Sequence, residues 1–148
     1  MSIQANSIVS GITATDDGLG ALILRVPVGA VLAAHGAQKL FGWFGGYGLE
    51  ATGQWMASVG LEPGYLMALL AGSAEFFGGI ALIFGLLTRP AAALAAFTMG
   101  VALTVHLPNG LFVSNNGYEY ALTLLAATLA LTLTGGGRYS IDQLFHRN

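Results

Sequence analysis

The stretch from residue 19 to residue 41 constrains the fold of this chain more than any other part of the sequence. At about 1.5 Å of rise per residue, a helix of this length crosses the roughly 30 Å hydrocarbon core of a bilayer. The stretch nevertheless contains Arg25, His35 and Lys39, and each ionisable group inside a spanning helix costs on the order of a few kcal/mol. On a helix these three side chains lie within an arc of roughly 80°. We therefore expect a polar stripe that faces protein rather than lipid.

The composition is that of a membrane protein. Of the 148 residues, 55% are hydrophobic and only 8% are charged, whereas about a quarter of the residues in an ordinary soluble domain are charged. The net charge of −2, with five Lys and Arg residues in total, argues against nucleic-acid binding, which needs a basic surface. The chain contains no cysteine, which excludes disulfides, thiolate metal sites and a redox-active thiol.

Four apolar stretches predict an all-α fold, a transmembrane four-helix bundle within residues 19–134. The predicted spans are at about 19–41, 64–87, 90–106 and 117–134. The connection between the first two spans, residues 42–63, is long for a bundle loop and is rich in Trp and Tyr, which favour the membrane interface. We expect it to form an interfacial or re-entrant segment.

Two polar segments flank the predicted spans. Residues 1–18 form a predicted polar tail, in which Asp16 and Asp17 are candidate N-caps for the first helix. Residues 135–148 form a predicted short polar tail at the other end of the chain. Four spans place both tails on one side of the membrane, together with Arg89, Arg138 and Arg147, and the positive-inside rule makes that side the cytoplasm.

Ionisable residues recur on all four predicted spans. Counted from the end of the bundle that carries residues 42–63, His35 lies roughly 9 Å deep, Glu75 roughly 16 Å deep and Arg25 roughly 24 Å deep. We expect Glu75 to pair with Arg25 or Lys39, and Glu75 and Glu119 together to balance both cations, because unpaired charges do not persist in lipid. The candidate ligand-binding residues are Arg25, His35, Lys39, Glu75, His106, Glu119 and Tyr120.

This set of side chains can either hold the helices in register or bind a polar ligand. The candidate catalytic groups are His35, Glu75 and Glu119, because they can exchange protons in a buried site. Hydrogen-bond donors on Arg25, Lys39 and Tyr120 suit the carbonyl oxygens of a quinone.

Other cofactors fit the sequence less well than a quinone. A haem between His35 and His106 is geometrically feasible, but two histidines alone are weak evidence for one. A zinc site would lack a third ligand, so no metal is expected. The chain contains no phosphate-binding or dinucleotide-binding glycine motif.

At these positions the chain resembles the DoxX family of small four-helix membrane proteins. The resemblance extends from about Leu19 to Leu144. It rests on Arg25, His35-Gly36-x-x-Lys39-Leu-Phe, Gly72-x-x-Glu75-x-x-Gly78-Gly, Gly85-x-x-x-Arg89, His106 and Gly117-x-Glu119-Tyr120. It implies a multi-pass protein of the bacterial inner membrane, associated with quinone-linked oxidation such as that of thiosulfate:quinone oxidoreductase-like complexes.

The leading hypothesis is therefore a quinone-interacting subunit or partner of a membrane oxidoreductase system. Because the chain has no cysteine, we expect the electrons to come from a redox protein partner or a bound cofactor. Whether the chain is itself catalytic stays open, as does homo-oligomer formation. Two alternatives are a pathway for a small solute or protons, and a structural or assembly protein of the bilayer with no catalysis.

Overall fold

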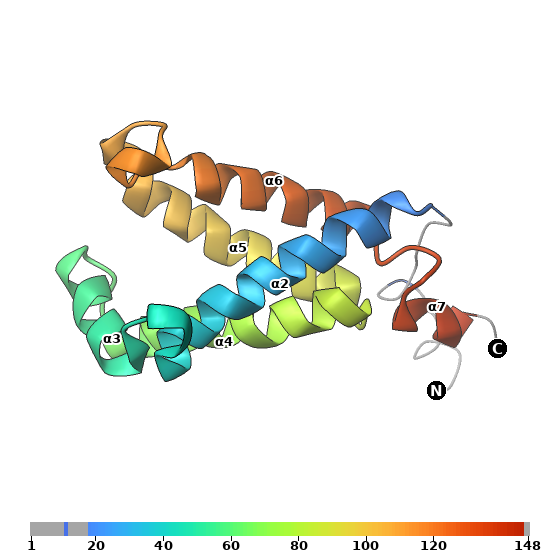
Figure 1. Ribbon diagram of the computed structural model, residues 1–148, viewed down its shortest axis with the longest axis horizontal. Coiled ribbons are helices and arrows are strands. Elements are labelled where there is room, and N and C mark those ends of the chain that lie inside the picture. The colour runs from blue at the N-terminus through green and yellow to red at the C-terminus, as the bar shows by residue number, and fades with distance from the viewer. Residues whose placement is uncertain (1–10, 12–17, 147–148) are drawn as a thin grey trace.

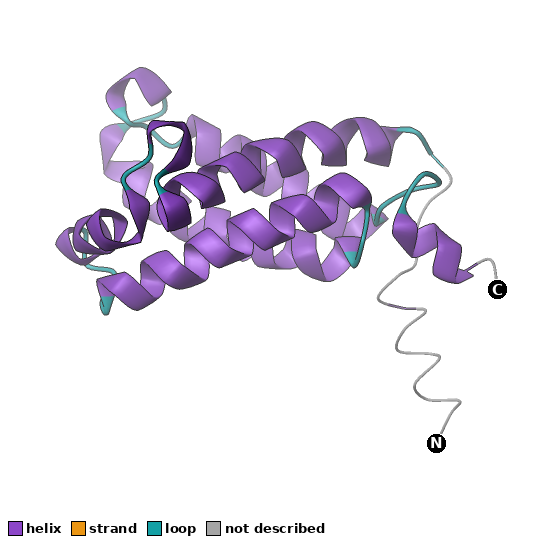
Figure 2. Cartoon of the chain, turned by 60° about the horizontal axis from the view of Figure 1, so that its bottom comes forward, coloured by secondary structure: helices purple, strands orange, loops and turns teal. Residues whose placement is uncertain are grey.

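Four long helices form an elongated bundle in the computed structural model, which describes residue 11 and residues 18–146 (Figures 1 and 2). They are α2 (Gly20–Phe41), α4 (Gly64–Phe84), α5 (Thr88–His106) and α6 (Glu119–Thr134). The described residues contain no strand, so the predicted all-α bundle is confirmed. The candidate caps Asp16 and Asp17, and most of the predicted N-terminal tail, lie outside the described residues.

Shorter elements cover the two ends of the bundle. Helix α3 (Gly48–Ser58) lies across one end, and α7 (Ile141–His146) lies at the other end (Figure 1). Short 3-10 turns, at Trp43–Gly45, Leu107–Asn109 and Val113–Asn115, complete the connections at the α3 end. The connection of residues 42–63 therefore contains a helix, α3, that packs at one end of the bundle (Figure 1).

The distribution of polar and apolar side chains is that of a protein in lipid. Phe97 and Leu133 are 73% and 76% exposed on the outside of the bundle, whereas Arg25 and Glu75 are 1% and 2% exposed inside it. Residues Gly20–Phe41, Gly64–Phe84 and Thr88–Asn109 are long and apolar enough to cross a membrane. Helix α6 has 16 residues and is about 24 Å long, so it forms a shorter fourth helix.

Helix α2 packs most extensively against α4, and glycines set their separation. A Cβ atom placed on Gly29 would lie 2.6 Å from the carbonyl oxygen of Gly79, closer than any real Cβ contact allows. Gly36 lies in the same way against Gly72 and Phe76. The two helices therefore run antiparallel in direct backbone contact, as small residues permit in lipid, and His35 lies level with Glu75.

Helix α4 begins beyond the end of α2 and packs there against α3. At this contact, Gly53 of α3 meets the first residues of α4, where a Cβ on Gly53 would lie 2.9 Å from Cα of Tyr65. At its other end α4 stops at Phe84, before residue 87 where the sequence predicts the end of the span, because Gly85 adopts a left-handed conformation (φ 66°) that terminates helices.

Candidate functional site

A buried ion pair between α2 and α4 lies at the centre of the candidate site. The Nζ atom of Lys39 donates to Oε2 of Glu75 over 2.5 Å, and the side chains are 21% and 3% exposed, respectively. Lys39 is in the last turn of α2, where a cation interacts favourably with the helix dipole. The prediction that Glu75 pairs with a cation of the first span is confirmed, with Lys39 as the partner.

A second contact brings α6 to the same place. The rings of His35 and Tyr120 lie with their centroids 5.3 Å apart. His35 also interacts electrostatically with Lys39, and Tyr120 with Glu75. His35, Lys39, Glu75 and Tyr120 therefore form one group from three helices, called the polar cluster below.

His106 and Glu119 lie outside the polar cluster and hold the connection between α5 and α6. The ring of His106 stacks on Trp55 of α3, with centroids 6.4 Å apart, and its Nδ1 atom lies 2.8 Å from the carbonyl oxygen of Asn116. Oε1 of Glu119 accepts a hydrogen bond from the backbone N–H of Val113 over 2.6 Å. The expectation that Glu119 balances a buried cation is wrong, because its carboxylate closes this connection instead.

Arg25 is at the opposite end of the bundle from the polar cluster. Its guanidinium donates to the carbonyl oxygens of Leu82 (2.9 Å), Ile83, Gly136 (3.0 Å) and Tyr139 (2.6 Å). The expectation that Arg25 pairs with Glu75 or Glu119 is therefore wrong. The last carbonyls of α4 have no partner within their own helix, and a cation is favoured at that end, so backbone oxygens take the place of a carboxylate.

Asp142 is a structural partner of Arg25 and of the start of α5 that the sequence pattern did not indicate. Its carboxylate accepts from the backbone N–H groups of Leu87 (2.7 Å) and Thr88 (2.8 Å), so it caps the start of α5. Asp142 also interacts electrostatically with Arg25. The predicted depth placed Arg25 at the end of the bundle where the chain continues into Asp142, but it did not indicate that residues 135–142 fold back against that end.

The predicted C-terminal tail is consequently part of the bundle. Gly135, Gly136, Gly137, Ser140 and Asp142 are all buried. Gly135 and Gly137 both have positive φ (78° and 75°), a conformation that side-chain-bearing residues rarely adopt. The three-glycine turn brings α7 back under the ends of α4 and α5 (Figure 1).

The two histidines considered for a haem have different neighbours. His35 contacts Tyr120, whereas His106 contacts Trp55 and Asn116. Among the residues that the structure describes, no three His, Asp or Glu side chains are grouped so that they could hold a metal ion.

Comparison with known proteins identifies the family. The family model for DoxX matches residues 20–107, which include α2, α3, α4 and α5. The chain belongs to the DoxX family. The matched residues include Arg25 and both members of the Lys39–Glu75 pair.

Several DoxX-type relatives are similar over most of their length. The Bacillus subtilis protein named "Putative oxidoreductase CatD" is 37% identical, with 77% of this chain and 79% of the relative covered. Two proteins of Escherichia coli, the inner membrane proteins YqjF and YphA, are 33% and 32% identical, with 88% and 82% of this chain and 95% and 87% of theirs covered. No solved structure matches the chain. The inner membrane proteins among these relatives and the three apolar helices of spanning length among the described residues indicate that this DoxX protein is a multi-pass protein of the inner membrane.

Proposed function

We propose that the polar cluster binds the headgroup of a quinone, and that the protein is a quinone-interacting subunit or partner of a membrane redox system. The observation that carries the proposal is the contact between His35 and Tyr120, next to the buried Lys39–Glu75 pair. One ion pair would be enough to fix the register of two helices. The added imidazole and phenol groups supply the donors that a quinone carbonyl requires.

Each group of the cluster has a distinct role in this proposal. Tyr120 and His35 donate hydrogen bonds to a carbonyl oxygen, and His35 or Glu75 holds a proton that accompanies reduction. Lys39 holds the Glu75 carboxylate in position through the ion pair. Arg25 is left out of the ligand set because its guanidinium is occupied by backbone carbonyls.

In this proposal, another protein or a bound cofactor donates the electrons that reduce the quinone. Reduction of a quinone to a quinol takes two electrons and two protons, and a chain without cysteine offers no redox thiol. One relative carries an oxidoreductase name, which supports a redox setting for this chain as well. A solute pathway is less well supported, since it would have to cross the core around Leu32, Leu82 and Leu131, each 0% exposed.

Changing Tyr120 to Phe, or His35 to Ala, is expected to weaken the binding of a short-chain benzoquinone by roughly 5- to 150-fold. This range corresponds to the loss of a hydrogen bond worth about 1–3 kcal/mol in a buried site. Quenching of tryptophan fluorescence measures the affinity, because Trp43 and Trp55 both lie at the α3 end of the bundle. Tyr118→Phe is the matched control, since it removes the same hydroxyl two residues away. Unchanged affinity in folded Tyr120→Phe and His35→Ala proteins would leave the cluster with a structural role only.

We also propose that both termini face the cytoplasm. Arg89 and Arg138 lie at the α7 end of the bundle, whereas the connections at the α3 end, residues 42–63 and 107–116, contain no Lys or Arg, as the positive-inside rule requires. Because the chain lacks cysteine, single cysteines at Ser2 and Ser114 can be labelled without background. A membrane-impermeant maleimide should reach position 114 from the periplasm and position 2 only after the membrane is opened. Labelling of both positions from one side would contradict this topology.

A further inference from the structure

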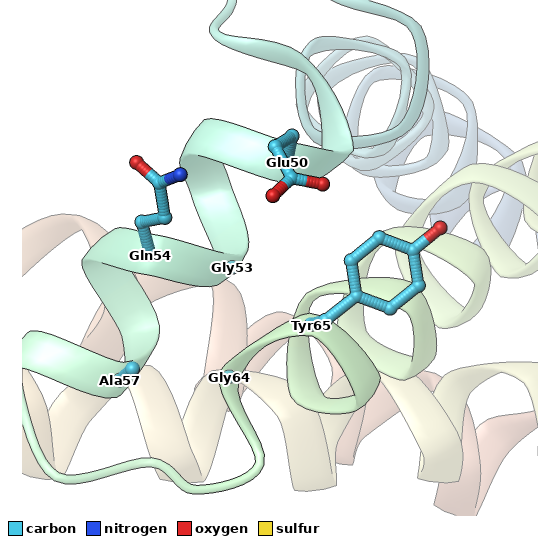
Figure 3. Close-up of a pocket in the computed structure, with 6 residues that line it drawn as sticks. All are labelled: Glu50, Gly53, Gln54, Ala57, Gly64 and Tyr65. Carbon is cyan, nitrogen blue, oxygen red and sulfur yellow. The ribbon is translucent and has the colours of Figure 1, made fainter.

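A hollow of about 200 Å³ lies between α3 and the first turn of α4, apart from the polar cluster (Figure 3). Glu50, Gly53, Gln54 and Ala57 line it from one face of α3, at the spacing of successive helical turns. Gly64 and Tyr65 line it from α4. Figure 3 shows the carboxylate of Glu50 and the ring of Tyr65 on either side of the opening.

Backbone contact between the two helices fixes the base of this hollow. Gly53 and Gly64 are buried, and a Cβ on Gly64 would lie 2.8 Å from the backbone nitrogen of Ala57. Neither helix can therefore move toward the other to close the space. Glu50 and Tyr65 are held at a separation that is set by the backbone and not by their own contact.

The chemistry of the lining selects a cation. No described residue donates a hydrogen bond to the Glu50 carboxylate or forms an ion pair with it. Residues 42–63 contain Glu50 and Glu62 but no Lys or Arg, so the local charge is negative. A carboxylate and an aromatic ring that line the same opening can provide an ion-pair partner and a cation–π contact, the two interactions that recognise ammonium groups.

The position of the hollow indicates where such a group comes from. Exposed aromatic side chains lie in α3 or in the residues just before it, with Trp43 at 55%, Tyr47 at 86% and Trp55 at 45% exposure. Aromatic residues gather in this way at the level of lipid headgroups. The hollow therefore opens into the layer in which primary ammonium groups of phospholipids lie.

We propose that this hollow binds a primary alkylammonium group, with Glu50 as its counter-ion and the ring of Tyr65 against it. The group is carried by an ethanolamine phospholipid or by a free amine of similar size. The site is separate from the quinone site proposed above, since none of its lining residues belongs to the polar cluster.

The test uses the full-length protein purified in micelles that contain phosphatidylethanolamine or phosphatidylglycerol, with bound lipid counted by native mass spectrometry. Glu50→Gln is expected to weaken retention of phosphatidylethanolamine about 10-fold, as for loss of a charged hydrogen bond. Tyr65→Leu should weaken it about 3-fold through loss of the cation–π contact. Glu62→Gln is the matched control. It removes the same charge from the same connection, but its side chain can still accept the hydrogen bond from the N–H of Gly64 and does not line the hollow.

Ethylammonium chloride distinguishes the two sources of the ammonium group. Displacement of the lipid by ethylammonium at millimolar concentration would support recognition of the ammonium itself, and resistance to displacement would support a site for the whole lipid headgroup. Equal retention by wild type and Glu50→Gln, or equal retention of phosphatidylglycerol by the wild type, would overturn the proposal. Glu50→Gln should leave quinone affinity unchanged. Lipid retention therefore tests the ammonium site, and quinone affinity tests the polar cluster, independently of each other.

Discussion

Replacing Glu75 by glutamine is expected to lower the free energy of unfolding by about 3 kcal/mol. The change leaves the ammonium of Lys39 without its partner in the interior of the bundle, and breaking a buried ion pair from one side typically costs about 3–5 kcal/mol. The 21% exposure of Lys39 sets the expectation at the lower end of this range. Unfolding by sodium dodecyl sulfate in mixed micelles, followed by circular dichroism, measures the loss.

A second variant separates the ion pair from other effects of the substitution. Lys39→Met combined with Glu75→Gln removes both charges, so the double variant should recover part of the stability that Glu75→Gln alone loses. Simple addition of the two single effects would contradict an energetic coupling between the two residues. In that case Nζ of Lys39 and Oε2 of Glu75 would be close, at 2.5 Å, but their contact would not stabilise the folded protein.

Replacing Arg25 by methionine is expected to have the largest effect on stability, a loss of about 4 kcal/mol. Hydrogen bonds from a charged donor contribute about 1.5–3 kcal/mol each, and the guanidinium makes them to carbonyls of α4 and of the turn before α7. Arg25→Lys should recover only a small part, because one ammonium cannot reach both sets of oxygens. The same detergent unfolding measurement applies.

Arg138 provides the control for this change. It is exposed at the same end of the bundle and lies with Cζ 5.7 Å from the centre of the Tyr139 ring. Arg138→Met removes an equal charge and should change stability by no more than about 0.5 kcal/mol. Equal losses in the two variants would mean that net charge, and not the carbonyl contacts of Arg25, stabilises this end.

The class of the fold and the main ion pair could be predicted because they follow from burial and charge. Few charged residues cannot cover a surface in water, and a carboxylate in the middle of an apolar helix requires a cation. The depth of Glu75 was harder to predict, because the estimate assumed that α2 and α4 end at the same level. In the structure α4 continues past α2 and packs on α3, which brings Glu75 level with His35.

The partners of Arg25 could not be predicted for a different reason. Backbone carbonyls are present at every residue, so the sequence does not show which of them will lack a partner at a helix end. The return of α7 depends on positive φ at Gly135 and Gly137, and three consecutive glycines also suit a flexible tail. From the sequence, Asp142 is therefore expected to be a surface residue, whereas the turn at residues 135–137 buries it in the structure.

The arginine contacts impose an order on the assembly of the protein. Arg25 enters the membrane with the first span, but Gly136 and Tyr139, which accept two of its hydrogen bonds, are synthesised 111 and 114 residues later. Until the turn before α7 is made, only the carbonyl oxygens of Leu82 and Ile83 at the end of α4 can accept hydrogen bonds from this guanidinium. A ribosome that stops before residue 136 therefore releases a chain in which the Arg25 guanidinium lacks two of the four backbone carbonyls that accept its hydrogen bonds.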